Sequence, residues 1–206
     1  MSFVEYQKKV DVSFGWMPQD IDTESLVSPF LSMAKSHHAA IIFDVATLTG
    51  TVVLSLLEGQ GVISDVITAV TDGGAGAGDF GVAGDRSARY LVGQLFVVSG
   101  STGNDGIYTV SAGGATYAAG VTTIPVDEAV ASAVADGSIT LMQAIAGKTV
   151  SVLTTTHEAV HILEVSAEEL DVENLYDSIA VRAVAAGAGG YIGCTVHRFP
   201  NRYSPL

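Results

Sequence analysis

Basic residues are scarce in this chain of 206 residues. Lysine and arginine together number nine against 22 aspartates and glutamates, which gives a formal net charge of −13. Affinity for nucleic acids and for anionic membranes depends mainly on cationic groups, so neither is expected as a partner. The basic side chains near the C-terminus are His197, Arg198 and Arg202, and we expect them to contact the acidic surface of a neighbouring subunit.

Cysteine is almost absent, and no long uninterrupted apolar run occurs. Cys194 stands alone, which excludes an intrachain disulfide, a thiolate zinc cage and an iron–sulfur site within one chain. A free, buried thiol is expected. The longest apolar run, residues 39–57, is broken by Asp44 and Gly50, and the first residues lack the apolar core of a signal peptide. The sequence therefore predicts a soluble protein that is not exported by a standard signal.

The residues that are abundant favour strands and turns. Hydrophobic residues make up 48% of the chain, aromatic residues only 7%, and 23 glycines are spread among them. Segments rich in β-branched residues fill 39–71 and return from Lys148 onward, each closed by turn residues. We therefore predict an all-β fold: an antiparallel jelly-roll-like β-sandwich formed by residues 1–71 and 144–206, in which residues 1–38 are an extended N-terminal arm.

An inserted small β domain is predicted over residues 72–143. It begins with a glycine-rich segment, 72–85, that is expected to be a flexible linker or an exposed loop because it has little apolar surface to bury. Two alternating strands follow between residues 91 and 110. Their connection is expected to be a structural turn in which Asn104, Asp105 and Gly106 supply the positive φ angles of a hairpin.

The letters HEAVH, residues 157–161, spell the signature of zinc proteases. That chemistry requires a helix, because a helix places both histidines on one face beside the same metal ion. Here the flanking residues are β-branched and alternate with a period near two, which favours a strand. On a strand the two histidines would lie about 13 Å apart, with the glutamate on the opposite face. We therefore reject His157, Glu158 and His161 as metal ligands.

Two further motifs fail for the same kind of reason. GAGDFG, residues 76–81, matches a dinucleotide-binding pattern, but no convincing helix follows its third glycine. AGKT, residues 146–149, is followed by a strand and lacks the first glycine of a phosphate-binding loop. A nucleophile elbow of the form G-x-S-x-G does not occur either. The sequence predicts no catalytic residue, no bound metal and no cofactor, hence no enzyme.

Several phrases resemble structural proteins of tailed bacteriophages. FVVSGSTGNDGIYTV (96–110), with GDRSARYLVGQ before it and TTIPVDEAV after it, is similar to a small β module found within larger phage virion proteins. The segments VDVSFGWMPQDIDT and VSAEELDVENLYDSIAVRAV look like those of small phage virion proteins built on β-sandwich cores. This resemblance implies a virion structural protein, most similar to a capsid decoration or cement protein on the capsid surface.

The resemblance also implies a partner and an assembly. The expected partner is the major capsid protein, bound at symmetric junctions by a homo-oligomer, with a trimer favoured. Trp16, in the N-terminal arm, is expected to contact a neighbouring subunit. A tail or baseplate component is the first alternative. A zinc hydrolase and a carbohydrate-binding module are weaker alternatives, the latter because few aromatic residues are present to bind sugars.

Overall fold

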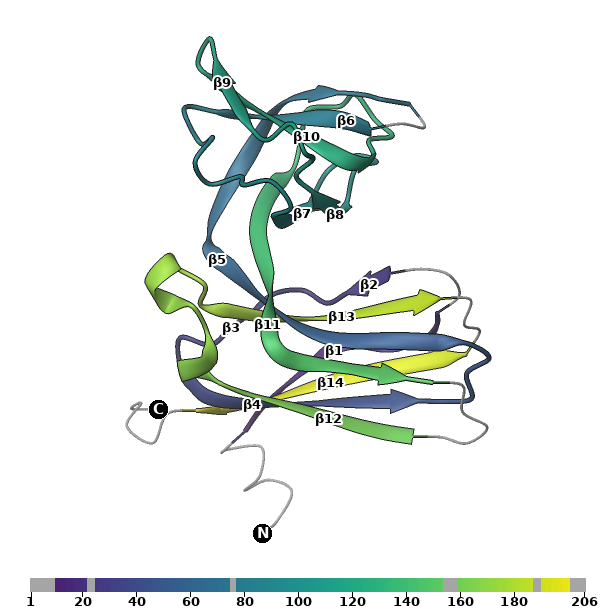
Figure 1. The fold of residues 1–206 in the computed structure, drawn as a ribbon. Coiled ribbons are helices and arrows are strands. Elements are labelled where there is room, and N and C mark those ends of the chain that lie inside the picture. Colours follow the sequence, from purple (N-terminus) through teal and green to yellow (C-terminus); the bar gives the residue numbers. More distant parts are fainter. Residues whose placement is uncertain (1–9, 22–24, 75–76, 154–158, 187–189, 201–206) are drawn as a thin grey trace. The chain divides into compact units, whose positions relative to one another are not determined.

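The computed structural model describes residues 10–21, 25–74, 77–153, 159–186 and 190–200, and their regular structure is almost entirely antiparallel β (Figure 1). This confirms the all-β prediction. The strands are β1 (Asp11–Asp20), β2 (Ser25–Val27), β3 (Leu31–Ser32), β4 (Ser36–Val45), β5 (Thr51–Thr71), β6 (Ala77–Ala83), β7 (Leu95–Ser99), β8 (Gly106–Thr109), β9 (Thr116–Ala118), β10 (Val121–Ala129), β11 (Ser138–Val152), β12 (Ala159–Ser166), β13 (Ser178–Ala186) and β14 (Tyr191–Pro200). Two short 3-10 helices, η1 (Ala167–Glu169) and η2 (Val172–Asn174), join β12 to β13. Within the described ranges no helix has the length and apolarity needed to span a bilayer.

The chain divides into two compact units. One contains residues 1–59 and 144–206, and the other contains residues 60–143. The sequence placed the insertion at 72–143, whereas the second unit starts earlier because β5 continues without a break to Thr71. The later part of β5 pairs with β6, so those residues belong to the sheet of the second unit.

The first unit is a sandwich of two antiparallel sheets. One sheet has the order β1-β14-β4-β12, and in the other β13 pairs with β2, β3 and β5, while β5 also pairs with β11. The chain changes sheet at nearly every connection, and the late strands β14 and β13 lie beside the early strands β1 and β2. This order is that of a jelly roll, so the predicted antiparallel sandwich is confirmed.

The core of this unit follows the two-residue period of its strands. Ile41, Phe43 and Val45 of β4 point inward and are buried, while the residues between them face outward. Leu54 and Leu56 of β5 contribute to the same core cluster from the other sheet. The sandwich therefore forms where the sequence alternates most regularly.

The expected N-terminal arm is not an arm over its described residues. β1 pairs with β14 from Asp11, opposite Arg198, to Asp20, opposite Tyr191. Trp16 is only 8% exposed and packs on Phe43, with ring centroids 6.4 Å apart. Trp16 is therefore part of the sandwich core, and its contact with a neighbouring subunit stays a prediction. Two register shifts within β1 interrupt the alternation of inward and outward side chains, so the sequence pattern does not indicate a strand here.

The second unit is a strongly curled sheet. Its strands follow the order β8-β7-β11-β5-β6-β10-β9. An antiparallel bridge between Val110 and Val126, and a hydrogen bond from the Ser111 amide to the Pro125 carbonyl at 2.9 Å, join the β8 end to β10. The sheet thus closes on itself around a core that includes Phe80 and Phe96.

The glycine-rich segment is a strand where a linker was expected. Its residues 77–83 form β6, which pairs with both β5 and β10, and Phe80 is fully buried. A Cβ atom at Gly78 would lie 2.4 Å from the Thr71 carbonyl oxygen, and one at Gly81 would lie 2.8 Å from the Ala69 Cβ. The prediction was wrong because these glycines permit close strand contact rather than flexibility.

The predicted hairpin exists as β7 paired with β8, but its turn chemistry differs from the prediction. The positive φ angles occur at Gly100 (69°) and Gly103 (95°), whereas Asn104 and Asp105 have none and Gly106 begins β8. Asn104 is 1% exposed, and its side chain exchanges two hydrogen bonds with the Ser132 backbone, at 2.8 and 3.0 Å. Asn104 therefore fastens the turn to a distant loop.

Candidate functional site

The described part of the HEAVH segment is extended. β12 begins at Ala159, and His161 lies opposite Phe43 of β4. His157 and Glu158 fall outside the described residues. In the described part of the chain, no three His, Cys, Asp or Glu side chains lie close enough to hold a metal ion. The Nε2 atom of His161 is buried without a hydrogen-bond partner, which places it toward the sandwich interior rather than on an open ligand surface.

The basic residues proposed as partner contacts have different environments. Arg198 donates to the Ser32 carbonyl at 2.8 Å and forms an ion pair with Asp11, and its side chain is 16% exposed. It therefore joins β1, β3 and β14 of its own chain, and its contact with a partner stays a prediction. His197 is half-buried in β14. Arg202 lies outside the described residues.

The outward side of the β1-β14-β4-β12 sheet exposes apolar side chains. Strand pairing places Asp44 between Val160 and Gly193, and Ile42 between Ile162 and Thr195. Val160 and Ile162 are 62% and 57% exposed. We call this surface the outer face; its members are Val12, Ala40, Ile42, Asp44, Val160, Ile162, Glu164, Tyr191, Gly193, Thr195 and His197. A cluster of exposed apolar side chains on one face of a sheet is typical of a binding surface.

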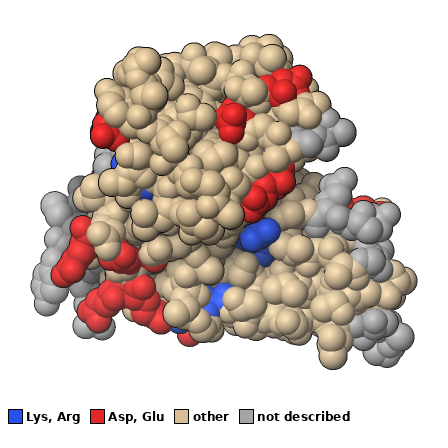
Figure 2. Space-filling view, turned by 45° about the horizontal axis from the view of Figure 1, so that its top comes forward, with Lys and Arg blue, Asp and Glu red and all other residues tan. Residues whose placement is uncertain are grey.

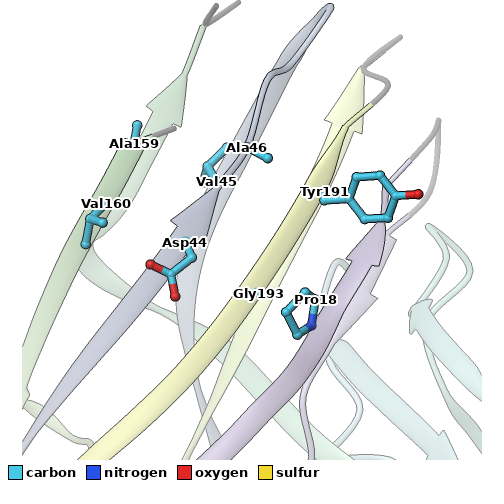
Figure 3. Close-up of a pocket in the computed structure, with 8 residues that line it drawn as sticks. All are labelled: Pro18, Asp44, Val45, Ala46, Ala159, Val160, Tyr191 and Gly193. Atoms are coloured by element: carbon cyan, nitrogen blue, oxygen red, sulfur yellow. The ribbon is translucent and has the colours of Figure 1, made fainter. Parts of the chain in front are cut away.

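A pocket of about 230 Å³ lies at one end of the outer face (Figure 3). Four neighbouring strands build it, and its walls are mainly apolar. Its lining residues are Pro18, Asp44, Val45, Ala46, Ala159, Val160, Tyr191 and Gly193. Gly193 leaves room at the floor, because a Cβ atom there would lie 3.2 Å from Pro18 Cγ.

Among the described residues that line the pocket, Asp44 is the only charged one. It is exposed, and no hydrogen bond or ion pair joins its carboxylate to another described residue. Figure 3 shows the carboxylate standing out from β4 between Val160 and Pro18. An unpaired carboxylate between apolar walls is suited to a ligand that combines a hydrocarbon stem with a positive charge.

Cys194 lies behind this face, on the core side of β14. It is 2% exposed, and burial, with a smaller contribution from the charge of Asp44, raises the pKa of its thiol to about 12. Because the folded state holds the thiol proton more tightly than the unfolded state, Cys194 makes its full contribution to stability at pH values below the unfolded-state pKa of about 8.5. That contribution is lost as the pH rises from there toward about 12.

The thiol is therefore expected to be unreactive in the folded protein. At pH 8 a thiol with an ordinary pKa is partly ionised, whereas Cys194 is not, so we expect labelling by a disulfide reagent to be slowed by about 1000-fold or more. The rate should be measured with and without guanidinium, and the denatured chain should yield one thiol per molecule. Rapid native labelling at pH 8 would contradict the burial of Cys194.

The surface charge is predominantly negative. On the face shown in Figure 2, acidic residues form several separate groups and few basic side chains are visible. This agrees with the formal charge of −13. A partner that binds through charge is therefore expected to be basic.

Comparison with known proteins identifies no family. No protein-family model matches the sequence, and no curated protein matches it either. Structural similarity extends to chains from the Gx and Gt strains of infectious bursal disease virus and from the VP2 subviral particle of that virus, at 9–10% identity and TM-scores of 0.18–0.19. These alignments cover 94% of this chain, which spans only 41–42% of the length of those chains.

Proposed function

We propose that this chain is a non-enzymatic structural protein of a virion, which binds the outside of a phage capsid and stabilises the shell. The observation that carries the proposal is the outer face: Val160, Ile162 and Tyr191 expose 57–62% of their surface on one sheet of the jelly roll. Jelly rolls occur in viral capsid domains, and phrases in the second unit resemble a phage virion module. Both support a role in contact rather than in chemistry.

Binding at symmetric junctions would stabilise a shell by adding buried surface across its seams. One copy with a small interface binds weakly, but many copies on one particle stabilise it together. An acidic chain of net charge −13 would also be attracted to basic patches on the shell. The major capsid protein is therefore the proposed partner, and the capsid surface is the proposed location.

The test is to image the particle of origin and to reconstitute the interaction. Shells lacking the chain are expected to disrupt at a lower temperature, and added chain is expected to restore stability at a fixed number of copies per shell. Electron microscopy should then show the chain at symmetric positions on the capsid. Density at the tail or baseplate would instead identify a tail component, and absence from the particle would disprove the virion role.

A further inference from the structure

The two edges of the four-stranded sheet differ in their suitability for pairing. β1, at one edge, carries two register shifts and Pro18, which cannot donate a hydrogen bond. β12, at the other edge, pairs regularly with β4 from Ala159 to Ser166 without a shift. Its one charged residue is Glu164, and it has no lysine or proline. β12 therefore lacks the usual protection of an edge strand.

We propose that an extended segment of a partner protein pairs with the edge of β12 that no described strand occupies, and inserts a lysine or arginine side chain into the pocket at Asp44. Backbone hydrogen bonds to β12 would supply the sequence-independent part of the affinity, and the cationic side chain would supply selectivity. The identification of that partner as a capsid protein rests on the proposed function, whereas the binding mode rests on the geometry of this face.

The distance from the added strand to Asp44 determines which partner side chain can contact the carboxylate. Asp44 lies opposite Val160 on the next strand, so an added strand would run two strand spacings away, about 10 Å. A short side chain opposite Val160 would end above that valine. A lysine or arginine can lay its hydrocarbon stem across Val160 and bring its charge to the Asp44 carboxylate.

Charge favours a basic partner over a second copy of this chain. The described residues that form the outer face include two carboxylates, Asp44 and Glu164, and no lysine or arginine. A second copy would bring the same carboxylates to the face, and two chains of charge −13 repel each other. A segment that alternates β-branched and basic residues complements both the edge and the pocket.

The inference can be tested by NMR titration of the full-length chain with a short peptide. The probe is acetyl-Thr-Val-Lys-Val-Thr-amide, and the matched probe replaces lysine with norleucine, which keeps the stem and removes the charge. Shift changes are expected at Val160, Asp44 and Tyr191 with the lysine peptide. Its affinity should exceed that of the norleucine peptide by about three- to five-fold, the range of a partly exposed ion pair.

Two variants test separately the charge of Asp44 and the volume of the pocket. Asp44→Asn should remove the preference for lysine, and Gly193→Ala should weaken both peptides by narrowing the floor of the pocket beside Pro18. Asp127→Asn is the matched control, because it removes one charge from an exposed strand position in the second unit. It should leave the titration unchanged.

The outcomes are decisive. Equal binding of both peptides, or the same loss of affinity in Asp127→Asn as in Asp44→Asn, would overturn the inference, as would shift changes spread over the acidic surface. Self-association through β12 in the absence of peptide would identify a second copy as the occupant and would overturn it as well. The titration needs no capsid, so failure of shell binding would leave this result standing.

Discussion

Replacement of Asp65 by alanine is expected to lower the free energy of unfolding by about 2–4 kcal/mol, the cost of leaving the buried Tyr90 hydroxyl and the partly buried Arg89 guanidinium without their acceptor. Asp65 lies in β5 within the second unit and is 8% exposed. Its carboxylate accepts hydrogen bonds from Arg89 at 2.7 Å and from the Tyr90 hydroxyl at 2.6 Å. Arg86 forms a further ion pair with it at 3.4 Å.

The loss has two sources. Without the carboxylate, the Tyr90 hydroxyl, 1% exposed, has no acceptor among the described residues, and the Arg89 guanidinium keeps among them only its bond to Gln60 at 2.6 Å. Asp65→Asn should cost less, because an amide oxygen still accepts one hydrogen bond. Urea unfolding followed by circular dichroism measures both losses, with Asp127→Ala as the exposed control. A loss below about 1 kcal/mol in Asp65→Ala would show that water replaces the carboxylate.

The same network makes stability depend on alkaline pH. Burial first, and then the hydrogen bond and charge of Asp65, raise the pKa of Tyr90 above its ordinary value. Because the folded state favours the protonated phenol, its contribution is complete below the unfolded pKa of about 10 and falls as the pH rises above it. In Asp65→Ala the free energy of unfolding should depend less on alkaline pH, because Tyr90 stays buried but its hydroxyl loses the Asp65 acceptor.

Much of the sandwich can be predicted from sequence because its strands alternate. The buried Ile41, Phe43 and Val45 follow a strict period of two, which is enough to identify β4 and its inward side. β1 and β6 could not be predicted in this way, for two different reasons. In β1, register shifts around Trp16 disrupt the alternation. In β6, glycines such as Gly81 reduce the apolar content that a strand usually shows.

The pocket could not be predicted in the same way. Asp44, Val160 and Tyr191 are far apart in sequence and become neighbours only through the order β14-β4-β12. One signal was available, since Val160 and Ile162 alternate with inward residues and so had to face solvent or a partner. Asn104 shows the opposite case. Asparagine is common in turns, which is why a turn was predicted at Asn104. Its hydrogen-bond partner, Ser132, lies 28 residues away in sequence and is brought close only by the tertiary fold.

The second large effect is expected for Phe96→Ala, which should destabilise the second unit by about 3–5 kcal/mol, as for other buried phenylalanines. Phe96 is fully buried, and its ring centroid lies 6.0 Å from that of Phe80, 6.1 Å from Tyr90 and 5.7 Å from Tyr108. Alanine would leave a cavity among three rings, two of which, those of Phe80 and Tyr108, are carried by β-strands. Phe96→Leu should retain most of the stability.

Exposed aromatic residues provide the control for Phe96→Ala. Tyr117 is 48% exposed, so Tyr117→Ala should change stability by less than about 0.5 kcal/mol. Amide hydrogen exchange resolves where protection is lost, and we expect the loss in β6, β7 and β8. Tyr90 contacts both Phe96 and Asp65. The double variant Asp65→Ala/Phe96→Ala should therefore lose less stability than the sum of the single losses, since both changes release the same tyrosine. Strict additivity would show that Tyr90 does not couple the polar network to the aromatic core.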